Sequence, residues 1–136
     1  MNKKLSRAKE LLDGGAALAV VNGGGELVFS ENGIKTLLTI PTASIAGAFI
    51  ADKVVGKAAA MILAYAGAVE VYAGIVSEPA LEVLKNKRIV CVYGKLVHNI
   101  ENKTRTDICP MEKTVLGVDD VEEAYELLRI KTGLNR

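Results

Sequence analysis

Asp52, Lys53 and Lys57 are the first candidates for chemistry, because three ionisable side chains fall within six positions just before the longest apolar run. That run, residues 58–69, carries only one polar side-chain atom. A segment that is polar at its first turn and apolar on every face afterwards is typical of a helix buried in a domain centre. We therefore predict a buried helix over residues 51–65, whose N-terminus presents the three charged groups.

Lys53 and Lys57 are four residues apart and would share one face of this predicted helix. The helix N-terminus adds partial positive charge, so an anion such as phosphate or carboxylate between the two ammonium groups would explain their spacing. Asp52 would then cap the helix, pair with a lysine or accept a proton. The alternative is a solvated first turn in which Asp52 is a plain N-cap.

A second candidate is the polar stretch 104–115 around Cys109. Pro110 fits the first position of a helix, which makes Cys109 the N-cap and Glu112 the third residue, a capping box with sulfur in place of a hydroxyl. A thiol at a helix N-terminus near a cation has a lowered pKa and can act as a nucleophile or redox sensor. Asp107 in the same stretch is a further candidate ligand contact. The alternative is an ordinary buried cysteine before a turn.

The remaining groups that could bind a metal are few and scattered. Zinc requires three or four Cys or His ligands, and this chain has two cysteines and one histidine, in separate sequence contexts. Cys91 lies between two valines and is predicted to pack in a strand, and His98 is predicted to lie in a loop. We therefore expect no metal site and no cofactor.

Composition excludes several classes of partner. The 136 residues are half hydrophobic, which suits one domain over residues 1–136, and 17 Lys and Arg nearly balance 16 Asp and Glu. No net field favours nucleic acid or an anionic membrane, and four Tyr, two Phe and no Trp do not build a base-stacking platform. The 12-residue apolar run is too short to span a bilayer. With no signal sequence at Met1, we expect a cytoplasmic protein with reduced thiols.

Periodicity and turn residues predict the elements that would position these groups. Leu5, Ala8, Leu11 and Leu12 form the apolar stripe of a first helix, which Gly14 ends. In order along the chain, we then predict strand 16–21, a hairpin loop at 22–25, strand 26–30, one or two helical turns at 34–40, an irregular stretch at 42–50, the buried helix, strand 69–76, helix 77–85, strand 88–93, an ambiguous stretch at 95–108 and helix 119–129.

This order predicts a three-layer α/β fold, in which a mixed sheet is flanked by helices. The first two strands would pair as an antiparallel hairpin, and the later strands would run parallel through helical crossovers. Ligand sites in such sheets lie at the carboxyl ends of strands and at the helix N-termini that face them. We therefore expect the site at the start of the buried helix.

The stretches ADKVVGKAAA (residues 51–60) and TDICPMEKT (residues 106–114) resemble an uncharacterised prokaryotic family with a cytidine-deaminase-like fold, and the resemblance covers nearly the whole chain. Deaminases of that fold begin one helix with His-x-Glu or Cys-x-Glu and the next with Pro-Cys-x-x-Cys. Here Asp52-Lys53-Val54 and Glu78-Pro79-Ala80-Leu81 stand in those places, so the zinc ligands are missing. What the resemblance implies is the pocket, where two helix N-termini meet at strand ends.

We therefore predict a zinc-independent deaminase-like domain that binds a small anionic or nucleotide-like metabolite. The predicted site residues are Cys109 and Asp52 as catalytic groups, and Lys53, Lys57, Glu112 and Asp107 as ligand contacts. The sequence leaves open whether the chain is an enzyme with a thiolate nucleophile, a non-catalytic binding or regulatory module, or a subunit with a vestigial pocket. It also leaves open self-association, which is common among deaminase-like domains.

Overall fold

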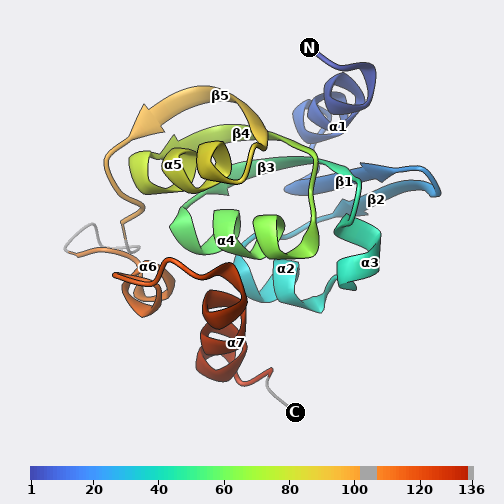
Figure 1. Ribbon diagram of the computed structural model, residues 1–136. Helices are drawn as coiled ribbons and strands as arrows, with labels where there is room; N and C mark the ends of the chain where they lie inside the picture. The colour runs from blue at the N-terminus through green and yellow to red at the C-terminus, as the bar shows by residue number, and fades with distance from the viewer. Residues whose placement is uncertain (102–106, 135–136) are drawn as a thin grey trace.

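One five-stranded sheet organises the fold (Figure 1). The computed structural model describes residues 1–101 and 107–134 and places the strands in the order β2-β1-β3-β4-β5. In chain order the elements are α1 (Lys3–Asp13), β1 (Leu18–Asn22), β2 (Gly25–Phe29), α2 (Ile34–Thr39), α3 (Thr42–Ile45), β3 (Phe49–Val55), α4 (Lys57–Ala66), β4 (Glu70–Ser77), α5 (Glu78–Asn86), β5 (Val90–Val97), α6 (Pro110–Thr114) and α7 (Val121–Thr132).

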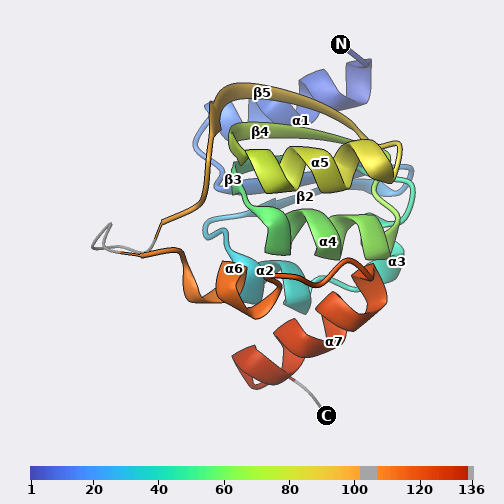
Figure 2. The same ribbon diagram turned by 60° about the vertical axis from the view of Figure 1, so that its left-hand side comes forward.

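The strand pairing is mixed. β1 runs antiparallel to both β2 and β3, whereas β3, β4 and β5 run parallel to one another. Parallel neighbours need a crossover, and α4 and α5 supply the two crossovers. α1 packs on one face of the sheet, and α4 and α5 pack on the other (Figure 2). The predicted α/β fold with a mixed sheet, an antiparallel first hairpin and later parallel crossovers is confirmed.

α4 is the buried helix at the centre of these layers. It contacts β3 and the surrounding helices α2, α3, α5, α6 and α7, and every residue from 58 to 63 is at most 4% exposed. Three consecutive alanines at its start allow these neighbours to approach closely. Gly67 ends the helix with a φ of 92°, in the left-handed conformation that favours glycine. A buried central helix is thus present, but it is shorter than predicted.

The predicted start of this helix is wrong. Residues 49–55 form the strand β3, and α4 begins only at Lys57. β-Branched Val54 and Val55 favour an extended backbone, and Gly56 separates the strand from the helix. A parallel strand covered on both faces reads as a nearly continuous apolar run, which periodicity alone does not separate from a buried helix.

Because this segment is a strand, its charged residues are not where the sequence pattern placed them. Asp52 and Lys53 are neighbours in β3, so their side chains leave opposite faces of the sheet. Asp52 is fully buried, whereas Lys53 is exposed. Only Lys57 lies in the first turn of α4, so the two lysines do not share a helix face.

Two other expectations about element ends had opposite outcomes. The helix predicted from Ser77 is confirmed, because the Ser77 hydroxyl accepts a hydrogen bond of 3.2 Å from the Ala80 N–H and Pro79 lies in the first turn. The last strand is predicted over residues 88–93, but β5 begins at Val90 and continues through Gly94 to Val97. A Cβ atom at Gly94 would lie only 3.0 Å from the carbonyl oxygen of Gly74, so a glycine suits the close approach of these strands.

Helix length also bears on a membrane role. α7, at 12 residues, is the longest helix in the described ranges. None of the described helices combines the length and apolar character needed to cross a membrane.

Candidate functional site

The N-terminus of α4 does hold an anion, and the chain supplies it. The Glu112 carboxylate accepts hydrogen bonds from the backbone N–H of Lys57 (2.7 Å to Oε1) and of Ala58 (2.8 Å to Oε2). Glu112 is only 8% exposed, so this contact is almost shielded from water. First-turn amides of a helix lack intrahelical partners, and a carboxylate also complements the helix dipole. The anion position predicted for a ligand is therefore occupied by a side chain 55 residues along the chain from Lys57.

Gly56 makes this contact sterically feasible, and sequence reasoning missed its role. A Cβ atom on Gly56 would lie 2.5 Å from Glu112 Oε1 and 2.8 Å from Ile100 Cγ1, well inside van der Waals contact. Its φ of −95° suits any residue, so the requirement for glycine here comes from space alone. The only sequence signal was a glycine directly before the apolar helix.

The capping box predicted for α6 is wrong. Cys109 is the N-cap residue of α6 as predicted, but its side chain makes no capping hydrogen bond. The Cys109 N–H donates to the Ile100 carbonyl at 2.9 Å, so Glu112 is not needed to satisfy it. Glu112 instead turns to α4, because two unpartnered helix amides there are better donors for a carboxylate than one amide that is already bonded.

Lys57 is held at the rim of α4 by a second contact with the same C-terminal segment. Its Nζ donates to the carbonyl oxygen of Val115 at 3.0 Å, which leaves two of its three N–H donors for other partners. Asp107, also predicted as a ligand contact, forms an exposed ion pair with Lys113. The hydrogen bond from Lys113, followed by one from the Ile108 N–H, lowers the pKa of Asp107.

Asp52 is neither a helix cap nor a partner of a cation within the described part of the chain. It lies between Leu18 of β1 and Ala73 of β4 in the sheet. Its Oδ1 accepts hydrogen bonds from Asn32 (3.2 Å) and weakly from the Val54 N–H (3.4 Å), whereas Oδ2 has no partner among the described residues. Burial raises the pKa of Asp52 to about 6, because the charged form loses its hydration.

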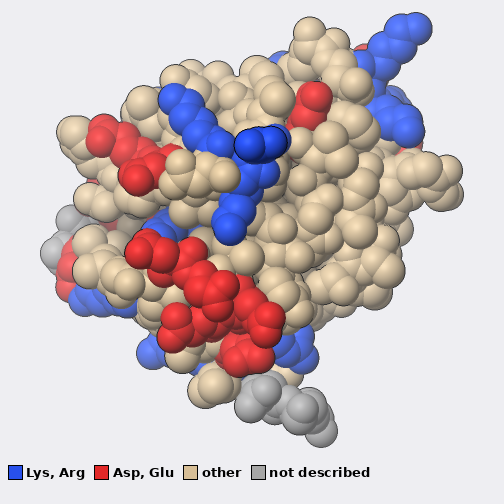
Figure 3. All heavy atoms as spheres, viewed as in Figure 1, with Lys and Arg blue, Asp and Glu red and all other residues tan. Residues whose placement is uncertain are grey.

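A cleft of about 210 Å³ opens beside Lys57, between α4, α5 and the segment that precedes α7. Figure 3 shows acidic and basic side chains close together on the face that α4, α5 and α7 present in Figure 1. The lining residues are Lys57 and Met61 of α4, Pro79, Glu82, Val83 and Asn86 of α5, and Lys87, Val118 and Asp119 from the two loops.

Of the six predicted site residues, only Lys57 lines this cleft. Glu112 contacts Lys57 from the side, and the remaining four lie elsewhere. Sequence reasoning missed Asn86 and Lys87, at the end of α5 and just after it, and Asp119, which it gave only as the first residue of a predicted helix. No pattern in the sequence connects these three residues, because only the packing of α5 against the later loop brings them together.

Metal coordination finds no support in the described ranges, where no three or more His, Cys, Asp or Glu side chains lie close enough to hold an ion. Residues 102–106, of which 104–106 belong to the second stretch predicted to carry chemistry, lie outside the described residues.

Cys91 is expected to react slowly with alkylating reagents. Burial raises its pKa to about 11, so at pH 8 only about one thiol in a thousand is ionised. In a Cys109→Ser variant, we expect iodoacetamide to modify Cys91 about 100-fold more slowly than a free cysteine, as followed by mass spectrometry. Rapid stoichiometric labelling of the folded variant would contradict the raised pKa of the half-buried Cys91 thiol.

Comparison with known proteins places this chain among proteins that share its fold. A family model described as "TM1506: Domain of unknown function (DUF1893)" matches residues 6–131. The chain is similar to the crystal structure of a DUF1893 family protein (TM1506) from Thermotoga maritima, with 28% sequence identity and a TM-score of 0.80. That similarity covers 98% of this chain and 91% of the Thermotoga chain. No protein with a curated function matches.

Proposed function

We propose that this chain, which belongs to the DUF1893 family, binds a small metabolite with an anionic group in the cleft between α4 and α5. The observation that carries the proposal is the composition of this cleft. Its lining includes two positively charged side chains, Lys57 and Lys87, and the apolar residues Met61, Val83 and Val118. A concave apolar site with a few convergent polar groups is the usual form of a small-molecule site.

The volume of the cleft favours a ligand smaller than a nucleotide. Pockets for drug-sized molecules occupy about 300–1,000 Å³, and this cleft offers about 210 Å³. A ligand the size of an amino acid or a single substituted ring would fill it. A nucleotide would place only its base or its phosphate inside.

The charged residues of the cleft further restrict the chemical class of the ligand. Glu82 and Asp119 share the cleft with the two lysines, so a purely anionic ligand would meet repulsion as well as attraction. A ligand with N–H donors as well as its anionic group would satisfy both sets of charges. Amino acids and carboxylated aromatic amines have this chemistry, and the planar polar ligands implied by the deaminase resemblance have it in part.

The helix N-terminus itself is not the proposed site, because Glu112 already bonds the first two amides of α4. Catalysis by Cys109 or Asp52 stays a prediction, since neither residue is among those that line the cleft. Asp52 is completely buried and does not reach a ligand on the surface. The arrangement therefore supports a binding module better than a thiol enzyme.

Replacing Lys87 by methionine is expected to weaken ligand binding about tenfold, since a charge-assisted hydrogen bond contributes roughly 1.5 kcal/mol. Binding would be measured by calorimetry with L-glutamate, 4-aminobenzoate and cytidine 5′-monophosphate as probes. We expect saturable binding of at least one of the two smaller probes and weaker binding of the nucleotide.

Lys85→Met is the matched control, because Lys85 is an exposed lysine two residues away that does not line this cleft. Both Lys85→Met and Cys109→Ala should leave the affinity for the probes unchanged. If none of the three probes binds, or if Lys87→Met and Lys85→Met have equal effects, this cleft is not the binding site. A loss of binding with Cys109→Ala would instead favour the thiol-dependent alternative.

A further inference from the structure

The outer edge of β5 is an exposed, apolar strand edge. Within the described ranges, β5 pairs only with β4, and no strand covers its other side. Val90, Tyr93 and Leu96 along it are 54%, 40% and 40% exposed. An unpaired edge offers a row of free backbone N–H and C=O groups, and at eight residues β5 is longer than a typical strand. A long apolar edge of this kind favours pairing with another strand.

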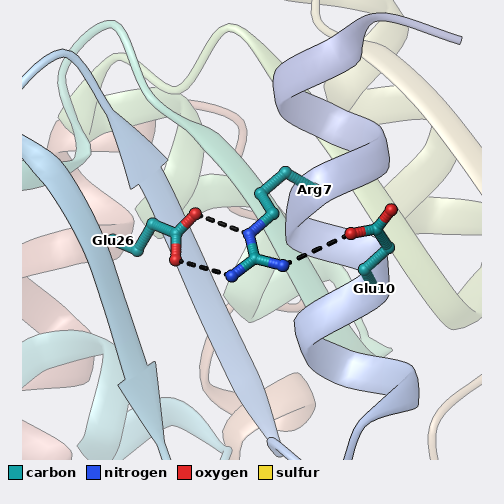
Figure 4. Close-up of polar contacts among 3 residues, drawn as sticks. All are labelled: Arg7, Glu10 and Glu26. Atoms are coloured by element: carbon teal, nitrogen blue, oxygen red, sulfur yellow. Dashed lines mark hydrogen bonds and ion pairs between the residues drawn. The ribbon is translucent and has the colours of Figure 1, made fainter.

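The opposite edge of the sheet, formed by β2, is in contrast protected against pairing with another strand. β2 has five residues, and Glu26 in it is held by Arg7 of α1 through two hydrogen bonds, of 2.6 and 3.1 Å (Figure 4). Arg7 also reaches Glu10 at 3.3 Å, so a charged cluster crosses from α1 to this edge. Short strands and charges are the usual devices that prevent edge pairing. On β5 the only charged side chain is Lys95.

We propose that β5 of a second copy of this chain pairs antiparallel with β5, which joins two sheets into one across a two-fold axis. Such a two-fold places one residue opposite itself. With Tyr93 at that position, Leu96 of one copy lies opposite Val90 of the other, so two exposed apolar positions are matched twice. Lys95 then lies opposite Cys91, and the two lysines do not face each other. A register centred on Lys95 would oppose like charges.

Charges at the ends of the strand complement this register. Arg88 is exposed, forms no ion pair with the described residues and lies in the turn just before β5. In the proposed register this turn comes near the end of the second copy's β5, which His98 follows. His98 Nδ1 lies 2.7 Å from Glu78 Oε2, so each Arg88 would approach an acidic group of the other copy. The complementarity is repeated at both ends of the paired strands, as a two-fold interface requires.

Pairing of β5 with β5 also explains why assembly would stop at two copies. If β5 paired with β2 of another copy, each copy would keep one free edge and the sheet would grow into a filament. Pairing of β5 with itself leaves only the β2 edges outside, and these carry the Arg7–Glu26 pair. The structure therefore favours a closed dimer.

The proposal is tested by measuring the molecular mass in solution, by light scattering and sedimentation, over a range of protein concentrations. The unmodified chain is expected to be a dimer. Leu96→Glu is expected to raise the dimer dissociation constant about 100-fold, because the change occurs twice in the interface. Leu27→Glu on β2 is the matched control, since Leu27 and Leu96 are 38% and 40% exposed, and it should leave the constant within about twofold. A monomer at all concentrations, a filament, or a dimer that tolerates Leu96→Glu would overturn the proposal.

Disulfide cross-linking between two copies tests the register of the paired strands separately from the affinity of the dimer. In a Cys91→Ser, Cys109→Ser background, Tyr93→Cys is expected to form an intermolecular disulfide under mild oxidation, because directly opposed residues have Cα atoms about 4.5–5.5 Å apart. Lys95→Cys in the same background should not, because the two cysteines would be four residues, or about 13 Å, apart along the strands. Cross-linking through residue 95 and not 93 would overturn the proposed register.

Discussion

Replacing Glu112 by alanine is expected to lower the free energy of unfolding by about 3 kcal/mol. The substitution removes two charge-assisted hydrogen bonds, of 2.7 and 2.8 Å, and leaves the partly buried amide of Lys57 and the buried amide of Ala58 without their partner. The loss would be measured by urea unfolding. Glu126→Ala, at an exposed glutamate of α7, is the control and should change stability by less than about 0.5 kcal/mol.

Gly56→Ala provides a second test of the same contact. The added methyl group would need the space that Glu112 Oε1 occupies, at 2.5 Å, so it should displace the carboxylate and cost a similar amount. Because both changes break one contact, the double variant Gly56→Ala, Glu112→Ala should be more stable than the sum of the two single losses predicts. Additive effects, or a harmless Glu112→Ala, would show that the carboxylate does not hold the start of α4.

Loss of the Glu112 carboxylate should weaken ligand binding in the cleft as well as destabilise α4. Glu112 and Val115 are the points at which the segment after β5 attaches to the central helix, through the amides and the Nζ of Lys57. The same segment continues to Asp119, which lines the proposed cleft. Glu112→Gln, which keeps the size of the side chain and one good acceptor, should therefore retain more ligand affinity than Glu112→Ala.

The sequence predicted the fold well because local signals were strong there. Gly67 ended the central helix, and Ser77 with Pro79 started α5, as capping rules require. The same rules failed over residues 51–55, where a strand that is mostly buried on both faces has the composition of a buried helix. The charges of Asp52 and Lys53 made a helix start plausible, although one of these residues is buried in the sheet and the other faces solvent.

The candidate site was harder to predict, since its residues are joined by packing between distant segments. Lys57 and Glu112 were both singled out from their types, but nothing local shows that a carboxylate 55 residues away binds the Lys57 amide. Lys87 and Asp119 carry ordinary surface charges in their own segments. They become parts of one cleft only because α5 and the start of α7 lie against α4.

Asp52→Asn is expected to stabilise the protein above pH 6 and to remove part of its pH dependence. The pKa of Asp52 rises from an ordinary value of 3.8 to about 6 in the folded chain. Between these two values the folded state binds more protons than the unfolded state, so stability falls as the pH rises through this window. A shift of this size corresponds to a cost of about 3 kcal/mol at neutral pH, from the burial of a charge without a cation beside it.

Asparagine has nearly the same shape and carries no charge, so it avoids this cost. Its amide can still accept the hydrogen bond from Asn32, but its NH2 group would replace Oδ2, which has no partner among the described residues. An unsatisfied amide costs about 1 kcal/mol, which leaves a net gain of about 2 kcal/mol at pH 7.5. The gain should shrink as the pH falls and vanish or reverse near pH 4, where Asp52 of the unmodified chain is protonated.

Urea unfolding of both proteins between pH 4 and pH 8 would test this, with the difference between the two curves as the quantity of interest. Glu31→Gln, at an exposed carboxylate in the loop that carries Asn32, serves as the control and should give a flat difference. If the difference for Asp52→Asn were equally flat, Asp52 would be ionised at no cost in the folded chain. Such a result would require a cation or ordered water at Oδ2, and so would identify Asp52 as part of a polar site.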